Sequence, residues 1–258
     1  MRRSILPLIL GIAFAATASA ERLQEPFDRT VDLRAGGAVT IENVNGRITV
    51  SSWDQPRVRI HATRKAETRE ALDKLSIDVR PTADGVAIVT RSPKQSEGGL
   101  FDFLFGNGDN TSVEYDVTVP RSSDLKVENT NGSINVADIN GRLELSTTNG
   151  RIEAMHCSGS INAGTTNGAI RAELLEVSPS KRMEFETTNG SISLTVPPTF
   201  AAEVEADTTN GSIRTDLPIM TRSFSRRELR GTMNGGGMQL SLHTTNGSIE
   251  IRSTGVTR

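Results

Sequence analysis

The sequence predicts an all-β solenoid, a parallel β-helix, from three observations. A dipeptide that ends in glycine recurs every nine residues between Asn131 and Gly168, and Thr-Asn-Gly recurs every eighteen. Apolar and polar residues alternate on both sides of each dipeptide, with the period of a β-strand. The same residue types return at the same place in every copy, which is typical of stacked repeat units. The expected corners are Asn131-Gly132, Asn149-Gly150, Asn167-Gly168, Asn189-Gly190, Asn210-Gly211 and Asn246-Gly247.

The apolar positions change parity across each corner. They lie at Leu143 and Leu145 before the corner at Asn149, and at Ile152 and Ala154 after it. Only a bend brings both sets to the same inward side. We expect the Asn-Gly pair to supply this bend, because both residues tolerate a positive φ.

An Asn-Gly pair between alternating strands is also the usual signal of a hairpin, so an antiparallel meander or sandwich is the alternative fold. In a coil, each strand pairs instead in parallel with its own copy one turn on. Parallel stacking puts Asn on Asn and Ile on Ile, which are favourable contacts. It also pairs outward charges of opposite sign, Glu153 with Arg171 and Arg214 with Glu250.

The first twenty residues have the three parts of a secretory signal peptide. Arg2 and Arg3 form a basic start, residues 5–15 an apolar core, and residues 18–20 a small-residue cleavage site. The apolar run is shorter than the ~20 residues that a transmembrane helix needs, and no later segment is a candidate. We therefore predict an exported protein, periplasmic or secreted to the cell surface. Its single domain would cover residues 21–258, with an N-terminal capping part at 21–120 and the regular coil at 121–258.

The capping part has longer strands and one helix. Residues 41–50 already match residues 127–136 in frame, so one turn of the coil is expected early in the chain. Residues 65–75 are predicted to form a short amphipathic helix. We expect the rest to cover the first edge of the coil, which would otherwise be an aggregation template. Strands are expected at residues 58–60, 75–79, 86–88 and 113–119, the last closed by Pro120.

Composition excludes several classes of function. The formal net charge of −2 argues against a nucleic-acid-binding protein, which needs a basic face. The sequence contains no nucleophile elbow, phosphate loop or HExxH motif. Its acidic residues are spread along the coil, whereas a polysaccharide-cleaving β-helix needs clustered carboxylates. We therefore predict no catalytic residues and no cofactor.

Cys157 is the only cysteine, so the chain has no internal disulfide. It is expected at the corner position that Thr148 and Thr166 hold in other turns. We predict a partly buried structural thiol there, because a reactive cysteine needs a positive local environment.

One outward row of the coil raises the question of a metal. Glu186, Asp207 and His243 hold the same place before three corners and would converge on neighbouring turns. Calcium-binding β-rolls use Asp-rich Gly repeats for this purpose, whereas these corners carry Thr and Asn. We predict no metal site, and a calcium ion at this row is the alternative.

The chain resembles a bacterial putative-adhesin family, a domain of unknown function. The resemblance rests on IENVNGRITVSSWD at 41–54, VEYDVTVP at 113–120, the TTNGSI corners and RGTMNGGGMQLSLHTTNGSIEI at 230–251. It covers essentially the chain after residue 20. It implies a right-handed parallel β-helix in the cell envelope that serves binding or adhesion, and it supplies no catalytic residues.

A Gly-rich stretch at residues 92–110 contains Phe101, Phe103 and Phe105. Three aromatic residues at alternate positions would present an apolar surface to a partner, a lipid or a neighbouring subunit. They are candidate binding residues. The alternative is that they fold back and plug the open end of the coil.

A second irregular stretch, residues 217–237, is rich in arginine. Arg222, Arg226 and Arg227 are candidate contacts for an anionic envelope polymer or a lipid headgroup. The alternative is a solvated basic loop, because Glu228 lies among them. We expect this stretch to leave the coil or to fold over its C-terminal end, since it falls in the 36-residue interval before the last corner.

The sequence thus predicts a non-enzymatic exported scaffold. Its rigid coil would present irregular stretches that bind an envelope protein, a glycan or a lipid surface. Two alternatives stay open. One is a structural element that self-associates end to end through its open strand edges, and the other is a glycan-active β-helix enzyme.

Overall fold

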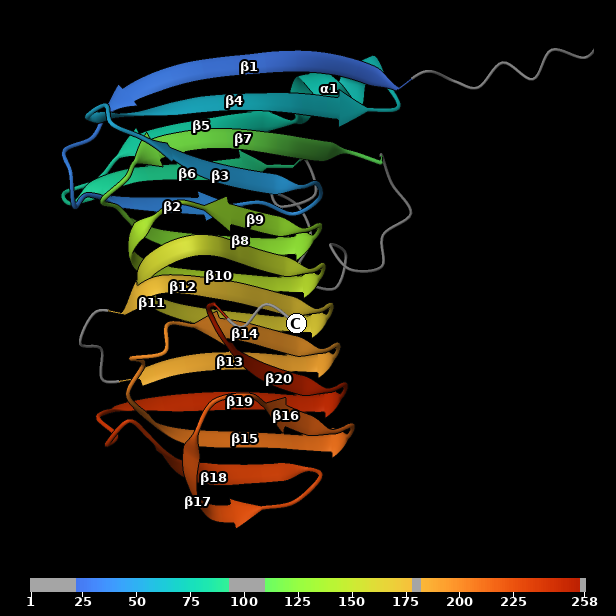
Figure 1. The fold of residues 1–258 in the computed structure, drawn as a ribbon. Helices are drawn as coiled ribbons and strands as arrows, with labels where there is room; N and C mark the ends of the chain where they lie inside the picture. Colours follow the sequence, from blue (N-terminus) through green and yellow to red (C-terminus); the bar gives the residue numbers. More distant parts are fainter. Residues whose placement is uncertain (1–21, 93–109, 178–181, 256–258) are drawn as a thin grey trace, which may run out of the picture.

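The computed structural model describes residues 22–92, 110–177 and 182–255. The described chain is all-β apart from one short helix, and its twenty strands join into one sheet that curls into an elongated coil (Figure 1). The predicted signal peptide at residues 1–20 lies outside the described residues. Within the described ranges, no helix is long and apolar enough to cross a membrane.

The strands that lead into the Asn-Gly corners stack side by side, with further strands beyond them at both ends, and we call this whole set row A. Its central strands are parallel and in register, with Asn149 opposite both Asn131 and Asn167. In spatial order row A runs β5 (Ser76–Pro81), β6 (Gly85–Arg91), β2 (Ala38–Glu42), β8 (Asp124–Asn131), β10 (Asn140–Asn149), the second part of β11 (Ile152–Asn167), β13 (Arg182–Asn189), β19 (Met238–Asn246), β15 (Ala202–Asn210), β18 (Glu228–Met233) and β17 (Ile219–Phe224).

The strands that follow the corners form a second set, row B, which is also parallel and in register at its centre. In spatial order row B runs β1 (Leu23–Asp32), β4 (Arg57–Ala66), β7 (Ser112–Pro120), β3 (Ile48–Trp53), β9 (Ile134–Ala137), the first part of β11, β12 (Ile170–Val177), β14 (Ile192–Val196), β20 (Ile249–Ser253) and β16 (Ile213–Thr215).

The pairing decides between the two folds that the sequence left open. Every turn of the repeat pairs in parallel with its neighbour, so the antiparallel meander is wrong for the coil. The predicted charge pairs are confirmed as well, because Glu153 lies opposite Arg171 and Arg214 lies opposite Glu250. The repeat therefore builds a solenoid-like β coil.

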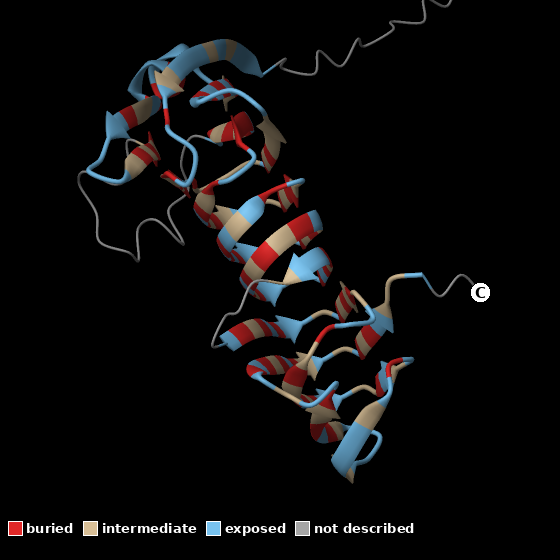
Figure 2. Ribbon diagram, turned by 60° about the vertical axis from the view of Figure 1, so that its left-hand side comes forward, coloured by how far each residue is buried: buried red, intermediate tan, exposed pale blue. Residues whose placement is uncertain are grey.

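The two rows bury their inward side chains in one continuous apolar core. Ile134, Ile152 and Ile170 lie opposite one another in row B, and each is at most 1% exposed. Buried and more exposed positions alternate along the strands of both rows (Figure 2). Burial of this continuous ladder of side chains is the main stabilising contribution to the coil.

Antiparallel strands lie at the N-terminal end of the coil. In row B, β1 pairs with β4 and β4 pairs with β7, while β5 pairs with β6 in row A. The helix α1 (Arg69–Lys74) begins after Thr68, whose Oγ1 accepts a hydrogen bond from the first turn. It is shorter than the predicted 65–75, because Lys65 and Ala66 continue β4 and pair with β1.

The stacking order departs from the sequence order at both ends of the coil. The turn formed by β19 and β20 inserts beside β13 and β14, so Asn246 lies between Asn189 and Asn210. The turn formed by β2 and β3 likewise lies between β8–β9 and the pair β6 and β7. Beyond β15, the hairpin of β17 and β18 closes the C-terminal end, which confirms the expectation for residues 217–237.

Candidate functional site

The Asn side chains of the corners form one hydrogen-bonded ladder along the outside of the coil. Each Nδ2 donates to the Oδ1 of the Asn in the adjacent turn at 2.8 Å. The predicted stacking of Asn on Asn is therefore confirmed, and it satisfies side-chain polar groups from turn to turn. The donors run in the order Asn210, Asn246, Asn189, Asn167, Asn149 and Asn131, and the ladder ends at Asn45.

The corner glycines are required by close stacking rather than by backbone conformation. Of the six predicted corner glycines only Gly132 has a positive φ, of 146°, so the expected reason is wrong for the other five. A Cβ on Gly168 would lie 1.9 Å from the carbonyl oxygen of Gly150 in the turn beside it. The same clash, at 1.8 to 2.1 Å, would occur at every corner glycine. Any side chain there would force adjacent turns apart.

The same glycine carbonyls each accept a hydrogen bond from a buried threonine. Thr165 Oγ1 donates to Gly150 O at 3.0 Å, and Thr187 Oγ1 donates to Gly168 O at 2.9 Å. The first Thr of Thr-Thr-Asn-Gly thus points inward, while the second lies nearer the surface. The motif is explained by structure: its residues hold adjacent turns together.

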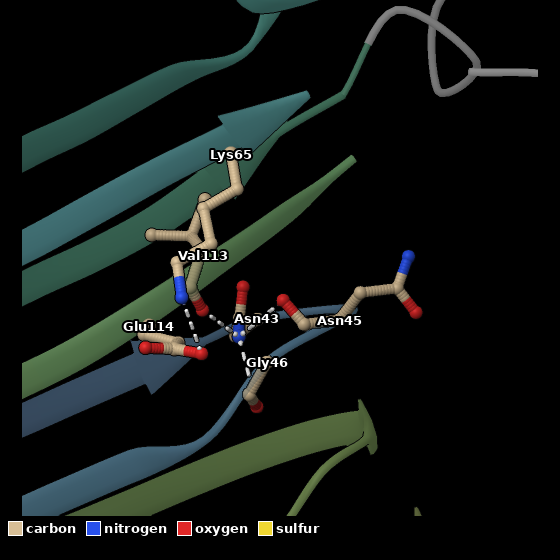
Figure 3. Close-up of polar contacts among 6 residues, drawn as sticks. All are labelled: Asn43, Asn45, Gly46, Lys65, Val113 and Glu114. Carbon is tan, nitrogen blue, oxygen red and sulfur yellow. Dashed lines mark hydrogen bonds and ion pairs between the residues drawn. The ribbon is translucent and has the colours of Figure 1, made fainter. Parts of the chain in front are cut away.

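Asn43 replaces that threonine in the first turn and ties the coil to the N-terminal cap. Its Nδ2 donates to Val113 O at 3.0 Å and to Asn45 O at 3.3 Å (Figure 3). Its Oδ1 accepts from Thr90 Oγ1 at 2.9 Å, and that hydroxyl lies 2.7 Å from the Tyr115 hydroxyl. Burial raises the pKa of Tyr115 to about 12. This buried network is fully hydrogen-bonded and has a structural role.

An ion pair flanks this junction on the outside. Lys65 Nζ lies 2.8 Å from Glu114 Oε1, and so joins β4 to β7 (Figure 3). The N-terminal end therefore combines buried hydrogen bonds with paired surface charge.

The predicted arginine candidates lie together on the C-terminal hairpin. Arg222 is in β17, whereas Arg226 and Arg227 are exposed in the turn between β17 and β18. Ser225 Oγ accepts hydrogen bonds from the backbone N–H groups of Arg227 and Glu228, which fixes the turn.

The three arginines differ in their partners. Arg222 lies 3.3 Å from Glu203, so its charge is already balanced. Arg227 Nη1 donates to the Thr209 carbonyl at 3.4 Å. Among the described carboxylates, none lies within 4.0 Å of Arg226 or Arg227. These two guanidinium groups carry the unbalanced positive charge of the hairpin.

Sequence reasoning missed two apolar residues on the same hairpin. Met220 is 80% exposed and Phe224 is 63% exposed, both in β17. Two apolar residues within a short strand resemble a core strand in sequence. They are exposed because β17 is the outermost strand of row A and pairs with β18 alone. The sequence carries no signal for their exposure, because β17 lies beyond the last corner-bearing turn only in the stacking order and precedes the corner at Asn246 along the chain.

A groove of about 550 Å³ lies on the outer side of row A beside this hairpin. Arg182, Glu203, Glu205, Arg222 and Arg230 are among its lining residues. Arg230 lies 3.0 Å from Glu205, so the groove has paired charges of both signs. This balance makes it a poor site for a single strongly charged ligand.

The three residues of the outward row that raised the question of a metal lie on neighbouring turns, as expected. His243 lies between Glu186 and Asp207, because the last turn inserts between theirs. Desolvation raises the pKa of Asp207, which weakens it as a ligand at acidic pH. Within the described ranges, no group of three or more His, Cys, Asp or Glu side chains is placed to hold a metal ion.

Cys157 is fully buried, which is deeper than predicted, and its place in the coil also differs from the prediction. It lies opposite Leu174 in the core, whereas Thr148 and Thr166 are exposed, so the expected corner equivalence is wrong. The Sγ lies 3.4 Å from the Met155 carbonyl. Burial raises the pKa of the thiol to about 11, so Cys157 is a structural residue.

The remaining candidate binding residues from the sequence, Phe101, Phe103 and Phe105, lie in the segment 93–109, which is outside the described residues. The candidate site that the structure supports is therefore the C-terminal hairpin. It combines two exposed apolar side chains with two unbalanced arginines.

Comparison with known proteins gives a family and several distant structures. The sequence profile described as Toastrack DUF4097 matches residues 107–252. No curated protein matches the chain. A putative cell adhesion protein from Clostridium sporogenes ATCC 15579 is 10% identical, with a TM-score of 0.44 over 89% of this chain and 100% of that one.

Two further solved structures are similar at lower scores. A putative adhesin from Bacteroides fragilis NCTC 9343 is 8% identical, with a TM-score of 0.34 over 89% of this chain and 97% of that one. A putative lipid binding protein from Parabacteroides distasonis ATCC 8503 is 11% identical, with a TM-score of 0.27 over 89% and 96%. Because every one of these scores is below 0.5, no functional argument rests on them.

Proposed function

We propose, since the chain belongs to the Toastrack DUF4097 family, that it is a non-enzymatic exported envelope scaffold that docks on an anionic lipid surface. The observation that carries the proposal is the joint exposure of Met220, Phe224, Arg226 and Arg227 at the C-terminal end of the coil. Exposed apolar side chains and unbalanced guanidinium groups on one hairpin suit the boundary between anionic headgroups and acyl chains.

The distribution of exposed apolar side chains supports this end of the coil as the docking site. Four large apolar residues are exposed among the described residues, namely Leu23, Leu175, Met220 and Phe224. The last two are the most exposed and share one strand. Along the coil itself, the side-chain amides of the corner asparagines hydrogen-bond to one another through the Asn ladder, so few of these polar groups are left to bind a partner.

The expected strength follows from the charges. Each arginine near an anionic surface contributes about 1 kcal/mol, so Arg226 and Arg227 together contribute about 2 kcal/mol, or roughly thirtyfold in partition coefficient. The interaction should weaken at high salt, because exposed charges are screened.

The test is co-sedimentation of the purified chain with vesicles of phosphatidylglycerol and phosphatidylcholine, at low salt. We expect the partition coefficient to fall by roughly thirtyfold in Arg226→Ala/Arg227→Ala. It should also fall in the separate variant Met220→Ser/Phe224→Ser. The matched control is Arg142→Ala/Arg151→Ala, which removes the same charge from exposed arginines at the middle of the coil. Vesicles of pure phosphatidylcholine give the charge-independent background.

Two results would contradict the proposal. Equal retention of the unchanged chain and the Arg226/Arg227 variant would exclude the hairpin as the lipid contact. An equal loss in the mid-coil control would show that net charge alone decides binding.

End-to-end self-association is a second candidate, and the open edge of β17 favours it. β17 pairs with β18 on one side only, and an exposed apolar edge strand is a template for pairing with another chain. Sedimentation velocity at rising protein concentration should then show oligomers that disappear in the Met220/Phe224 variant. A monomer at every concentration would exclude this candidate.

We also propose that the coil is a right-handed parallel β-helix within a single domain at residues 21–258. In-register parallel pairing of the turns supports the coil. Export is supported by the basic, apolar and small-residue order of residues 1–20. Phe101, Phe103 and Phe105 are proposed as a further contact with an envelope partner.

A further inference from the structure

Three corners of the coil have the same local sequence but different surroundings. Asn189, Asn210 and Asn246 each lie within Thr-Thr-Asn-Gly-Ser-Ile. An Asn followed by Gly deamidates when the next backbone nitrogen attacks the side-chain amide, and Asn is a thermolabile residue for this reason. Because the flanking residues are identical, any difference in rate among the three has to come from the fold.

The two inner asparagines are held on both sides. Asn189 Oδ1 accepts from Asn246 Nδ2, and Asn246 Oδ1 accepts from Asn210 Nδ2, each at 2.8 Å. The attacking nitrogens are also engaged, because Gly190 N–H donates to Asn246 O at 3.0 Å and Gly247 N–H donates to Asn210 O at 3.1 Å. Attack would break both kinds of bond.

Asn210 is the last member of the ladder. Its Nδ2 donates to Asn246, but no further Asn follows to donate to its Oδ1. Within the described part of the chain, the N–H of Gly211 has no acceptor. The neighbouring hairpin accepts hydrogen bonds from Thr208 N–H and Ile213 N–H, which lie on either side of this corner. It accepts none from the N–H of Gly211 at the corner itself.

We propose that Asn210 is the site in the ladder that ages by deamidation, while the inner corners are protected. The Gly211 nitrogen loses its proton to solvent base and forms a bond to Asn210 Cγ. The Cγ–Nδ2 bond breaks and ammonia leaves, which gives a succinimide. Water then opens either carbonyl of the ring, so the products are aspartate and isoaspartate, with no oxidant or reductant involved.

The product would weaken the end of the coil. A carboxylate at position 210 has no N–H to offer the Asn246 Oδ1, so the outermost rung of the ladder is lost. The new negative charge also lies next to Thr209, whose carbonyl accepts from Arg227. Deamidation would thus change the charge next to the hairpin while every residue of the hairpin stays unchanged.

The test is a time course of the folded chain at neutral to mildly alkaline pH, with tandem mass spectrometry to place each amide-to-acid conversion. We expect Asn210 to convert about tenfold faster than Asn189 and Asn246, because it lacks two hydrogen bonds, each worth a factor of about two to ten. The same chain in denaturant is the control, and there the three rates should be equal.

Conversion at Asn210 that does not exceed that at Asn189 and Asn246 in the folded chain would overturn the proposal, and so would no conversion at any of the three. Unequal rates in denaturant would also overturn it, because the difference would then belong to the sequence. The deamidation rates are measured without vesicles, so this test does not depend on whether the hairpin binds lipid.

Discussion

Substitution of Gly168 by alanine should disrupt the coil at one defined contact. The added Cβ would lie 1.9 Å from Gly150 O and 2.5 Å from the attached carbonyl carbon, both of which are backbone atoms. Gly168 has an ordinary φ, so no backbone strain accompanies the change. The effect would therefore measure the steric requirement between turns alone.

The size of the effect follows from the hydrogen bonds at this contact. Contact at 3.4 Å would be ordinary, so the turns must separate by about 1.5 Å at this point. Three hydrogen bonds of 3.0 Å cross the gap, from Gly150 N–H to Asn167 O, from Ile152 N–H to Ala169 O, and from Thr165 Oγ1 to Gly150 O. At about 1 kcal/mol each, their loss lowers the free energy of unfolding by about 3 kcal/mol. That is a large part of the 5–15 kcal/mol that stabilises a typical domain.

The assay is urea unfolding followed by circular dichroism, with Gly164→Ala as the matched control. Gly164 lies in β11, the strand that leads into the corner at Gly168, and a Cβ there would meet nothing within 4 Å. The control should leave stability unchanged or raise it by about 0.5 kcal/mol, because Gly costs conformational entropy in a strand. A Gly168 variant as stable as the control would refute the steric explanation of the corner glycines.

Three further predictions follow from the ladder and the core. Asn167→Ala should lower the free energy of unfolding more than Asn210→Ala does, by about 1 kcal/mol in urea unfolding, because Asn167 makes two ladder bonds and Asn210 makes one. The pKa of the Cys157 thiol is raised from 9.0 to about 11, so the folded state holds the thiol proton more tightly than the unfolded state does. Its contribution to the free energy of unfolding is therefore complete below pH 9 and is lost as the pH rises to 11. This pH dependence should be absent in Cys157→Ala. Asn210→Asp should reduce retention on anionic vesicles through its place near Arg227, whereas Asn149→Asp, which adds the same charge at mid-coil, should not; equal retention of the two variants would contradict this.

The sequence was sufficient to predict the corners and the stacking of the central turns, but positive φ is the wrong reason for five of the six corner glycines. The spacing of Asn131, Asn149 and Asn167 fixes which residues stack, because parallel in-register pairing puts like on like. The need for Gly168 arises from a carbonyl that is distant in sequence, in the adjacent turn. Local conformational preference could not reveal that contact, so positive φ was the natural but incorrect inference.

The order of the last turns could not be predicted from sequence for a related reason. Asn189, Asn210 and Asn246 lie in identical hexapeptides, so each of them fits equally well beside either of the others. The structure places Asn246 between the other two. What decides the order is the hairpin of β17 and β18, which pairs with β15 and so makes β15 the outermost turn. The repeat thus specifies register but leaves order to the irregular segments.

The same reasoning explains why the candidate site was only half predicted. Arg226 and Arg227 stand out in sequence as a cationic pair, whereas Met220 and Phe224 resemble core residues of a strand. Their exposure depends on β17 being the last strand, which is a property of the stacking order. The two arginines of the candidate site can be recognised in the sequence, whereas the exposure of Met220 and Phe224 can be recognised only from the order of the strands.

The two ends of the coil stop the ladder in different ways, and this difference places the exposed chemistry at one of them. At the N-terminal end, Asn45 Nδ2 donates to Thr111 O, and Asn43 joins the buried network under the cap. At the C-terminal end, Asn210 has no further rung beyond it, and the hairpin covers the strand but leaves the corner open. In the middle of the coil each turn hydrogen-bonds the corner groups of the next, whereas the last corner lacks a neighbour on one side. The proposed lipid docking by the hairpin and the proposed deamidation of Asn210 both follow from this unpaired end of the coil.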